Sequence, residues 1–264
     1  MPLAPALAAY DTILLDLDGC VWVGAEPTPR AVEAVAALRA AGRRVGFVTN
    51  DGRPSEEDLV RKLWGLGIQA SREEVVTVGG ALQYALAEAQ RSTAFVIGSP
   101  SMHRHVADAG LRILNGSDLA DRAEVVVVAE HDGFDYHELK DAVRAGLRGA
   151  ELWCTGRDAN FPDEGGISPG TGAIVAAVEY ATGATARSVG KPEPQIFVTA
   201  LDRLGGERAL MIGDRLDADV AGAHAAGISG ALVLTGGDTV DDARAAERSP
   251  DHVAANLGDL VLGR

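Results

Sequence analysis

Tyr10-Asp11-Thr12-Ile13-Leu14-Leu15-Asp16-Leu17-Asp18-Gly19-Cys20 is the stretch around which the fold is built. Its apolar run predicts a short buried strand that ends in two carboxylates separated by one leucine. Alternate side chains of a strand point the same way, so Asp16 and Asp18 start on one face. Because like charges repel, this pair predicts a neighbouring cation, and a hard dication such as Mg2+ takes oxygen ligands. Gly19 lets the backbone turn sharply after the second carboxylate.

Strand and helix patterns alternate along the rest of the chain. The first part predicts a helix over 28–41, ended by Gly42, a strand over 43–50 and a helix over 55–66. This order implies a parallel sheet with right-handed crossovers. From about residue 78 the pattern restarts, with helices over 81–91, 102–109, 135–148 and 170–182 and strands over 94–98, 125–130 and 152–155. The closing part predicts strands over 186–189, 209–212 and 229–234 and a helix over 195–204.

These patterns predict an α/β fold with a Rossmann-like parallel-sheet core and an inserted α/β cap. We expect the core to comprise residues 1–78 and 184–264, and the cap to comprise residues 79–183. The uninterrupted β-branched run Val125-Val126-Val127-Val128 is typical of a strand covered on both faces. The acidic, Ala-rich segment 238–246 offers no chemistry that the sequence alone can support.

Polar groups with possible roles stand at three further strand ends. Thr49-Asn50 supplies a hydroxyl and an amide, both suitable donors to phosphate oxygens, although the pair alone is more typical of a turn. Lys191 lies in Gly190-Lys191-Pro192, between a strand and a helix, where a lone lysine is ordinarily a solvated charge. Asp214 and Asp219 lie in Gly213-Asp214-Arg215-Leu216-Asp217-Ala218-Asp219, after an apolar strand. The carboxyl edge of an open sheet is where ligands bind.

Together, in this order, the four signals resemble the motifs of the haloacid dehalogenase superfamily. The run D-L-D-G-C-V-W-V-G and the position of the cap resemble its NagD-like branch (class IIA, C2-type cap). The resemblance implies that Asp16 attacks phosphorus and that Asp18 handles protons. It implies phosphate binding by Thr49, Asn50 and Lys191, and a Mg2+ site made by Asp16, Asp214 and the backbone carbonyl of Asp18. Asp219 and Gly19 would support this site.

The chain departs from the pattern of this branch at a few positions. Asp51 stands where a second Asn is usual, Cys20 where Thr is usual, and Gly156 where Asn is frequent. A buried Cys behaves as a small apolar residue, so the Cys20 change is tolerable. Next to Gly156, Arg157 is a candidate substrate residue, because its planar donors suit an anionic or hydroxylated leaving group. The alternative for Arg157 is a surface salt bridge of little energetic value.

Composition limits the classes of partner. The chain has 264 residues and a net charge of −14, which argues against nucleic acid or an anionic membrane as partner. Its apolar runs are too short to span a bilayer, and the N-terminus lacks the basic region of a signal peptide. With two cysteines, Cys20 and Cys154, a disulfide framework is not expected, which suits a reducing cytoplasm.

The resemblance implies a Mg2+-dependent phosphomonoester hydrolase acting on a small phosphorylated metabolite through an aspartyl-phosphate. Glycerol 3-phosphate is one candidate substrate, and nucleoside monophosphates or pyridoxal phosphate are alternatives within the same branch. A dehalogenase would need only the first acid of the pair, so Asp18 counts against that class. A non-catalytic regulatory or scaffold protein on this fold is the alternative from another class. Because relatives often pair through the cap, a homodimer is also expected.

Overall fold

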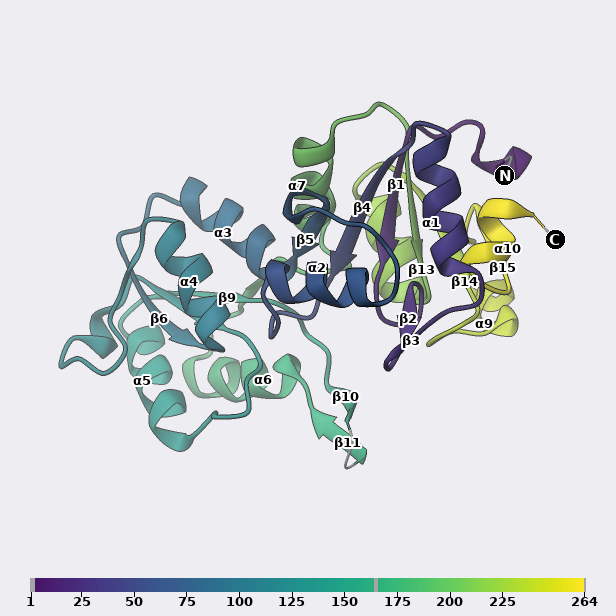
Figure 1. Ribbon diagram of the computed structural model, residues 1–264. Helices are drawn as coiled ribbons and strands as arrows, with labels where there is room; N and C mark the ends of the chain where they lie inside the picture. The colour runs from purple at the N-terminus through teal and green to yellow at the C-terminus, as the bar shows by residue number, and fades with distance from the viewer. Residues whose placement is uncertain (1–2, 164–165, 264) are drawn as a thin grey trace. The chain divides into compact units, whose positions relative to one another are not determined.

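A computed structural model describes residues 3–163 and 166–263, and the chain divides into two compact units. The first unit comprises Met1–Thr49, Glu56–Val76 and Lys191–Arg264, and the second comprises Asn50–Ser55 and Thr77–Gly190. Each unit is built around its own sheet with helices packed against it (Figure 1). This confirms the predicted α/β class, with a parallel core sheet and a second parallel sheet.

The first unit contains a six-stranded sheet in the order β15-β14-β13-β1-β4-β5. Strand β1 lies inside this sheet and pairs in parallel with β13 on one side and β4 on the other. The strands are β1 (Thr12–Asp16), β4 (Arg44–Thr49), β5 (Val75–Thr77), β13 (Ala209–Gly213), β14 (Ser229–Val233) and β15 (His252–Ala254). A small antiparallel hairpin, β2 (Trp22–Val23) and β3 (Glu26–Pro27), follows β1.

The helices of the first unit include α1 and α10, which lie side by side (Figure 1). Helix α1 ends just before Gly42, whose φ of +72° is the left-handed conformation that glycine adopts at low cost, as predicted. The helices are α1 (Ala31–Ala40), α2 (Glu56–Gly65), α7 (Pro194–Leu204), α8 (Ala221–Ala225), α9 (Val240–Ala245) and α10 (Leu257–Leu262). Short turns are η1 (Pro5–Leu7), η2 (Arg72–Glu74) and the π-helical turn η4 (Leu216–Val220).

The register of the central strands determines where the site forms. Asp16, the last residue of β1, pairs with Val48 of β4, and Leu15 pairs with Ile212 of β13. The residues that follow Val48 and Ile212 therefore leave the sheet at the same edge as Asp16. Parallel pairing thus brings together the carboxyl ends of β1, β4 and β13, where Asp16, Thr49 and Asp214 were predicted.

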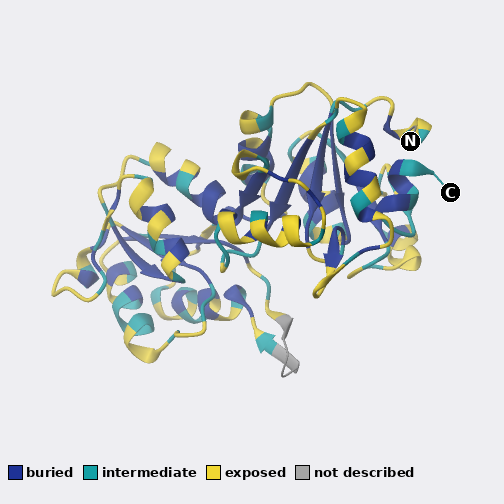
Figure 2. Ribbon diagram, in the orientation of Figure 1, coloured by how far each residue is buried: buried dark blue, intermediate teal, exposed yellow. Residues whose placement is uncertain are grey.

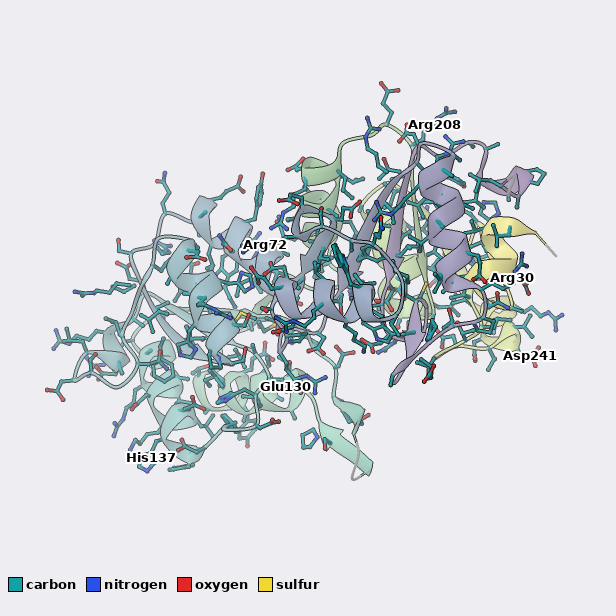
Figure 3. The ribbon with its side chains drawn as sticks, in the orientation of Figure 1. Arg30, Arg72, Glu130, His137, Arg208 and Asp241 are labelled. Carbon is teal, nitrogen blue, oxygen red and sulfur yellow. The ribbon has the colours of Figure 1, made fainter. Side chains whose placement is uncertain are left out.

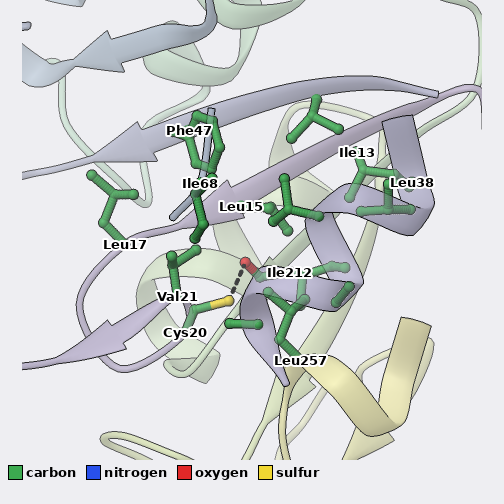
Figure 4. Close-up of a cluster of buried hydrophobic side chains, with 14 of the residues drawn as sticks. Ile13, Leu15, Leu17, Cys20, Val21, Leu38, Phe47, Ile68, Ile212 and Leu257 are labelled. Carbon is green, nitrogen blue, oxygen red and sulfur yellow. Dashed lines mark hydrogen bonds between the residues drawn. The ribbon is translucent and has the colours of Figure 1, made fainter. Parts of the chain in front are cut away.

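A buried apolar cluster supports this edge (Figure 4). It includes Leu17 and Val21 from the turn after β1, packed with Phe47 and Ile212 from the neighbouring strands. Cys20 is fully buried here, and its thiol donates a hydrogen bond to the carbonyl of Ile212 at 3.5 Å. Burial also raises the pKa of the Cys20 thiol well above its usual value. The cysteine thus behaves as a small apolar residue, as predicted.

The second unit contains a five-stranded sheet in the order β12-β9-β8-β6-β7, with parallel pairing throughout. All four residues of β8 are buried, which confirms the strand predicted to be covered on both faces (Figure 2). The strands are β6 (Thr93–Ile97), β7 (Arg112–Ile113), β8 (Val125–Val128), β9 (Glu151–Cys154) and β12 (Arg187–Ser188), with the hairpin β10 (Asn160–Asp163) and β11 (Gly166–Pro169). The helices are α3 (Val78–Glu88), α4 (Pro100–Asp108), α5 (Tyr136–Leu147), α6 (Thr171–Thr182) and the turn η3 (Ala120–Arg122).

Helix α3 begins three residues before the predicted start at residue 81. The Thr77 hydroxyl caps it by accepting a hydrogen bond from Gly80 N at 3.1 Å. Two glycines in its first turn made a helix there improbable from propensity. Packing explains Gly79, because a Cβ at this position would overlap the ring of His105.

Charged side chains such as Arg208 and Asp241 lie on the outside of the first unit (Figure 3). Cys20 and Cys154 are both buried and unpaired. Within the described residues, none of the helices is both long and apolar enough to cross a membrane.

Candidate active site

Asp16 and Lys191 form the centre of the candidate site. Asp16 ends the central strand β1 and is buried, and the Lys191 ammonium donates a hydrogen bond to its Oδ1. Lys191 Nζ also donates to Asp219 Oδ1 at 2.7 Å. The lysine is therefore buried between two carboxylates and is no solvated surface charge. The family resemblance implied that Lys191 binds phosphate and that Asp219 supports the site, and the contacts of Lys191 with both carboxylates come from the structure.

The loop after β13 holds Asp219 and Asp214 in fixed positions. Asp219 is 1% exposed, and its Oδ2 accepts a hydrogen bond from Arg215 N at 3.0 Å. A Cβ at Gly213 would overlap the Asp219 carboxyl group, so a glycine is required beside it. Asp214 is 6% exposed, and its Oδ2 accepts a hydrogen bond from Gly237 N at 2.5 Å.

Two glycines from separate loops enclose the Asp214 carboxylate. A Cβ at either Gly19 or Gly236 would overlap it, so any side chain at these positions would displace the carboxylate. Gly19 also has a φ of +85°, which disfavours other residues. Gly19 thus acts both through its turn conformation, as predicted, and through the space that it leaves for Asp214.

The segment Thr235-Gly236-Gly237-Asp238 completes this side of the site, and the sequence did not single it out. Thr235 donates a hydrogen bond from its hydroxyl to the carbonyl of Gly19. Asp238 N donates to the Asp214 carbonyl at 3.0 Å, and Asp238 Oδ2 accepts from Leu216 N. Segment 238–246, for which the sequence alone supported no chemistry, thus contacts the loop of Asp214 through its first residue, Asp238. The glycine pair Gly236-Gly237, in the loop after β14 at the same sheet edge, is the signal that could have indicated this segment.

Asp18 and Thr49 lie at the same sheet edge. Thr49 is the last residue of β4 and is 3% exposed. Asp18, two residues beyond β1, is exposed, and its Oδ1 accepts a hydrogen bond from Trp22 Nε1 at 2.7 Å. Asp18 is therefore accessible to solvent, whereas Asp16, Asp214 and Lys191 are buried.

The other two candidates, Asn50 and Arg157, belong to the second unit. Asn50 directly follows Thr49 in the chain, and its side-chain oxygen would lie 2.8 Å from a Cβ at Gly190. Arg157 donates to Glu179 Oε1 at 2.9 Å and to the Ala186 carbonyl at 2.6 Å. The Arg157 guanidinium lowers the pKa of the Glu179 carboxyl below its usual value. The salt bridge considered for Arg157 is thus present, and its role toward a substrate stays a prediction.

The charges of the buried groups favour a bound cation. Among the described residues, Asp16, Asp214 and Asp219 each offer an oxygen atom, and these atoms lie within 4.8 Å of one another. Burial raises the pKa of Asp214 above its usual value, and the charge of Asp219 raises it further. Burial opposes the charged form of Lys191, but Asp16 and Asp219 outweigh it and raise the pKa of the ammonium. Three carboxylates and one ammonium leave an excess of two negative charges, and their oxygen donors fit Mg2+.

Comparison with known proteins agrees with this geometry. A family model described as haloacid dehalogenase-like hydrolase matches residues 13–112, and another, described as HAD-hydrolase-like, matches residues 188–260. The chain is 36% identical over 256 residues to the D-glycerol 3-phosphate phosphatase of Mycobacterium tuberculosis, an alignment that covers 95% of this chain and 71% of that protein.

Two crystal structures are similar over nearly the whole chain. The glycerol phosphate phosphatase from Mycobacterium tuberculosis in complex with magnesium has a TM-score of 0.91 at 34% identity, covering 97% of this chain and 78% of that one. The 4-nitrophenylphosphatase from Thermotoga maritima has a TM-score of 0.89 at 31% identity, covering 97% and 98%. With the four motifs in order along the chain, the chain belongs to the haloacid dehalogenase-like hydrolases, in their NagD-like class IIA branch, and it is a phosphatase.

Proposed function

We propose that this phosphatase hydrolyses phosphate monoesters of small metabolites through an aspartyl-phosphate on Asp16. The observation that supports this most is the buried contact of Asp16 with Lys191 at the end of the central strand. A carboxylate held there by an ammonium is fixed in position for attack on phosphorus. The neighbouring carboxylates of Asp214 and Asp219 supply the oxygen donors of a cation site.

The residues of this chain divide the reaction between them. A carboxylate oxygen of Asp16 attacks phosphorus, and Asp18 gives a proton to the leaving alkoxide. Asp18 then takes a proton from the water that hydrolyses the aspartyl-phosphate. Thr49, Asn50 and Lys191 bind the phosphoryl oxygens and offset their charge. The exposure of Asp18 supports its role, because a group that exchanges protons with substrate and water must be reachable by both.

Asp16 and Asp214, with the backbone carbonyl of Asp18, are the groups that would hold Mg2+. When bound there, the metal offsets negative charge on the phosphoryl group. Asp219 supports the site by holding Lys191, from whose Nζ its Oδ1 accepts a hydrogen bond at 2.7 Å. Gly19 supports it by leaving room for the Asp214 carboxylate.

For the substrate we propose a small phosphorylated metabolite, with glycerol 3-phosphate as first candidate. The similarity to a glycerol 3-phosphate phosphatase over 95% of this chain supports this choice. Nucleoside monophosphates and pyridoxal phosphate remain alternative substrates.

We also propose that the chain forms a homodimer and that it works in a reducing cytoplasm. The unpaired state of both cysteines supports the reducing compartment. Light scattering on the purified chain tests the dimer.

The function is tested by assaying the purified chain with Mg2+ and a panel of phosphate esters. The panel comprises 4-nitrophenyl phosphate, both glycerol phosphates, nucleoside monophosphates, pyridoxal phosphate and sugar phosphates, ranked by kcat/KM. Hydrolysis of 4-nitrophenyl phosphate separates an enzyme from a scaffold protein on the same fold. Failure to hydrolyse any ester would contradict the proposal, whereas a ranking led by another ester would replace glycerol 3-phosphate only.

A further inference from the structure

Trp22 contacts the carboxylate to which both proton transfers are assigned. Its indole Nε1 lies 2.7 Å from Asp18 Oδ1, a distance typical of a strong, charge-assisted hydrogen bond. Trp22 is 1% exposed, whereas Asp18 is exposed. The buried indole is therefore the fixed partner in this contact, and it restricts the position of the exposed Asp18 side chain.

The position of Trp22 is determined by three elements. Its backbone N donates to the Leu17 carbonyl at 3.0 Å, and its carbonyl accepts from Gly19 N at 2.7 Å. In the β2–β3 hairpin it pairs with Pro27. Lys62 Nζ of α2 lies 3.9 Å from the centroid of the indole ring, a favourable position for a cation over an aromatic face. The turn, the hairpin and α2 thus hold the indole N–H next to Asp18.

The hydrogen bond has a consequence for the two oxygens of Asp18. An exposed aspartate samples several rotamers, and this contact favours the one in which Oδ1 meets the indole. An indole N–H can only donate, so Oδ1 must accept. The proton that Asp18 gives and takes is then carried by Oδ2.

We propose that Trp22 is a positioning residue for Asp18, a role that rests on the proposed function. In the first step Asp16 forms a bond to phosphorus, the phosphorus–oxygen bond of the ester breaks, and the proton on Asp18 Oδ2 moves to the ester oxygen to give the alcohol. In the second step a water oxygen bonds to phosphorus, the bond to Asp16 breaks, and one water proton moves to Asp18 Oδ2. Trp22 holds Oδ2 in place for both transfers.

A purely structural role for the contact predicts different kinetics. A buried indole N–H needs an acceptor, and Asp18 supplies one whether or not it is catalytic. Loss of the N–H would then affect all esters alike. A positioning role instead affects esters according to their need for a proton, because an alkoxide leaving group requires one and 4-nitrophenolate, a stable anion, does not.

The decisive variant is Trp22→Phe, assayed with glycerol 3-phosphate, or the best alkyl ester of the panel, and with 4-nitrophenyl phosphate. For the alkyl ester we expect kcat/KM to fall by about tenfold or more, part of the roughly 10²–10⁴-fold that general acid catalysis contributes. For 4-nitrophenyl phosphate kcat/KM should stay within about twofold, because kcat/KM covers only the steps up to ester cleavage. The kcat for 4-nitrophenyl phosphate should nevertheless fall, because hydrolysis of the aspartyl-phosphate still needs Asp18 as base. Its KM should fall by the same factor, since the slower step follows ester cleavage.

Equal losses of kcat/KM for both esters, or no loss for either, would overturn the positioning role. An inactive wild-type chain would instead count against the proposed function, so the two failures are distinguishable. Trp64→Phe is the matched control, because Trp64 Nε1 donates to the Ala70 carbonyl at 2.8 Å on an exposed part of the same unit. If Trp22→Phe does not fold, 3-benzothienylalanine at position 22 keeps the ring volume and replaces the N–H by sulfur.

A readout independent of turnover is the indole N–H resonance of Trp22, assigned by its loss in the Trp22→Phe spectrum. In the 15N-labelled chain we expect it downfield of the other indole signals, and Asp18→Ala should move it upfield. An unchanged resonance in Asp18→Ala would show that the contact is not formed in solution, and would also refute the role.

Discussion

Replacing Lys191 by methionine is expected to destabilise the first unit strongly when no metal is supplied. Methionine matches the length of the lysine stem and removes only the ammonium. The side chain of Lys191 is 5% exposed, and those of its partners Asp16 and Asp219 are 9% and 2% exposed. Removing one partner of a buried ion pair costs about 3–5 kcal/mol, because the remaining charge stays buried without compensation. Here two carboxylates lose their partner, so the upper part of that range is expected.

The measurement is urea unfolding in the presence of a chelator, followed by tryptophan fluorescence. Because the carboxylates raise the pKa of Lys191 above its ordinary value, the ammonium stays charged in the folded chain up to and beyond that value. Its stabilisation is therefore present at neutral pH and is lost only as the pH rises through the raised pKa. The destabilisation by Lys191→Met should accordingly be similar at neutral and mildly alkaline pH.

Asp16→Asn provides the second arm of a double-mutant cycle. It removes one of the two uncompensated charges, so Lys191→Met should cost less in this background, by at least about 1 kcal/mol. A cost of Lys191→Met below about 1 kcal/mol in the wild-type background would refute the buried ion cluster. Simple additivity of the two substitutions would refute the direct contact of Lys191 with Asp16.

Four further predictions concern activity. Asp16→Asn should abolish turnover without unfolding the chain, and activity above a small fraction of the wild-type rate would exclude Asp16 as nucleophile. EDTA should abolish activity and Mg2+ should restore it. Ca2+ should inhibit, because it prefers longer bonds and more ligands than Mg2+. Full activity in the presence of chelator would contradict the metal role of Asp214. Gly236→Ala should lower activity about tenfold or more by displacing the Asp214 carboxylate, and wild-type kinetics would argue against the close contact. Arg157→Ala should reorder the ranking of esters by kcat/KM while changing turnover of 4-nitrophenyl phosphate much less. Glu179→Gln, which removes the salt bridge but keeps the guanidinium, is the control. An unchanged ranking in Arg157→Ala would mean that Arg157 serves only surface structure.

Local pattern was sufficient for the long elements and for the residues at their ends. Asp16, Thr49 and Asp214 each follow or end an apolar run, and the carboxyl ends of parallel strands meet at one sheet edge. Their side chains could therefore be assigned to one site without knowing any distance. Lys191 follows β12, which belongs to the five-stranded sheet, so only the family resemblance indicated its place in the site. The structure places Asp16, Lys191 and Asp214 together. Short strands such as β2, β5 and β7 were not predicted, because two or three residues are too few to show a period.

The sequence by itself determined the fold class and the buried acid at the end of β1, because both follow from apolar periodicity and from the carboxyl edge of a parallel sheet. Tertiary structure alone decided which loops return to that acid. The contacts of Lys191 with Asp219 and of Gly237 with Asp214 join residues 28 and 23 positions apart. The pairing of β13 with β14 brings together the loops that carry Asp214 and Gly237, and the packing of α7 against α8 brings together the segments that carry Lys191 and Asp219. The exposure of Asp18 and the burial of Trp22 likewise depend on packing around the turn. A residue pattern specifies which face is apolar, but the distances between side chains arise only when separate elements pack together.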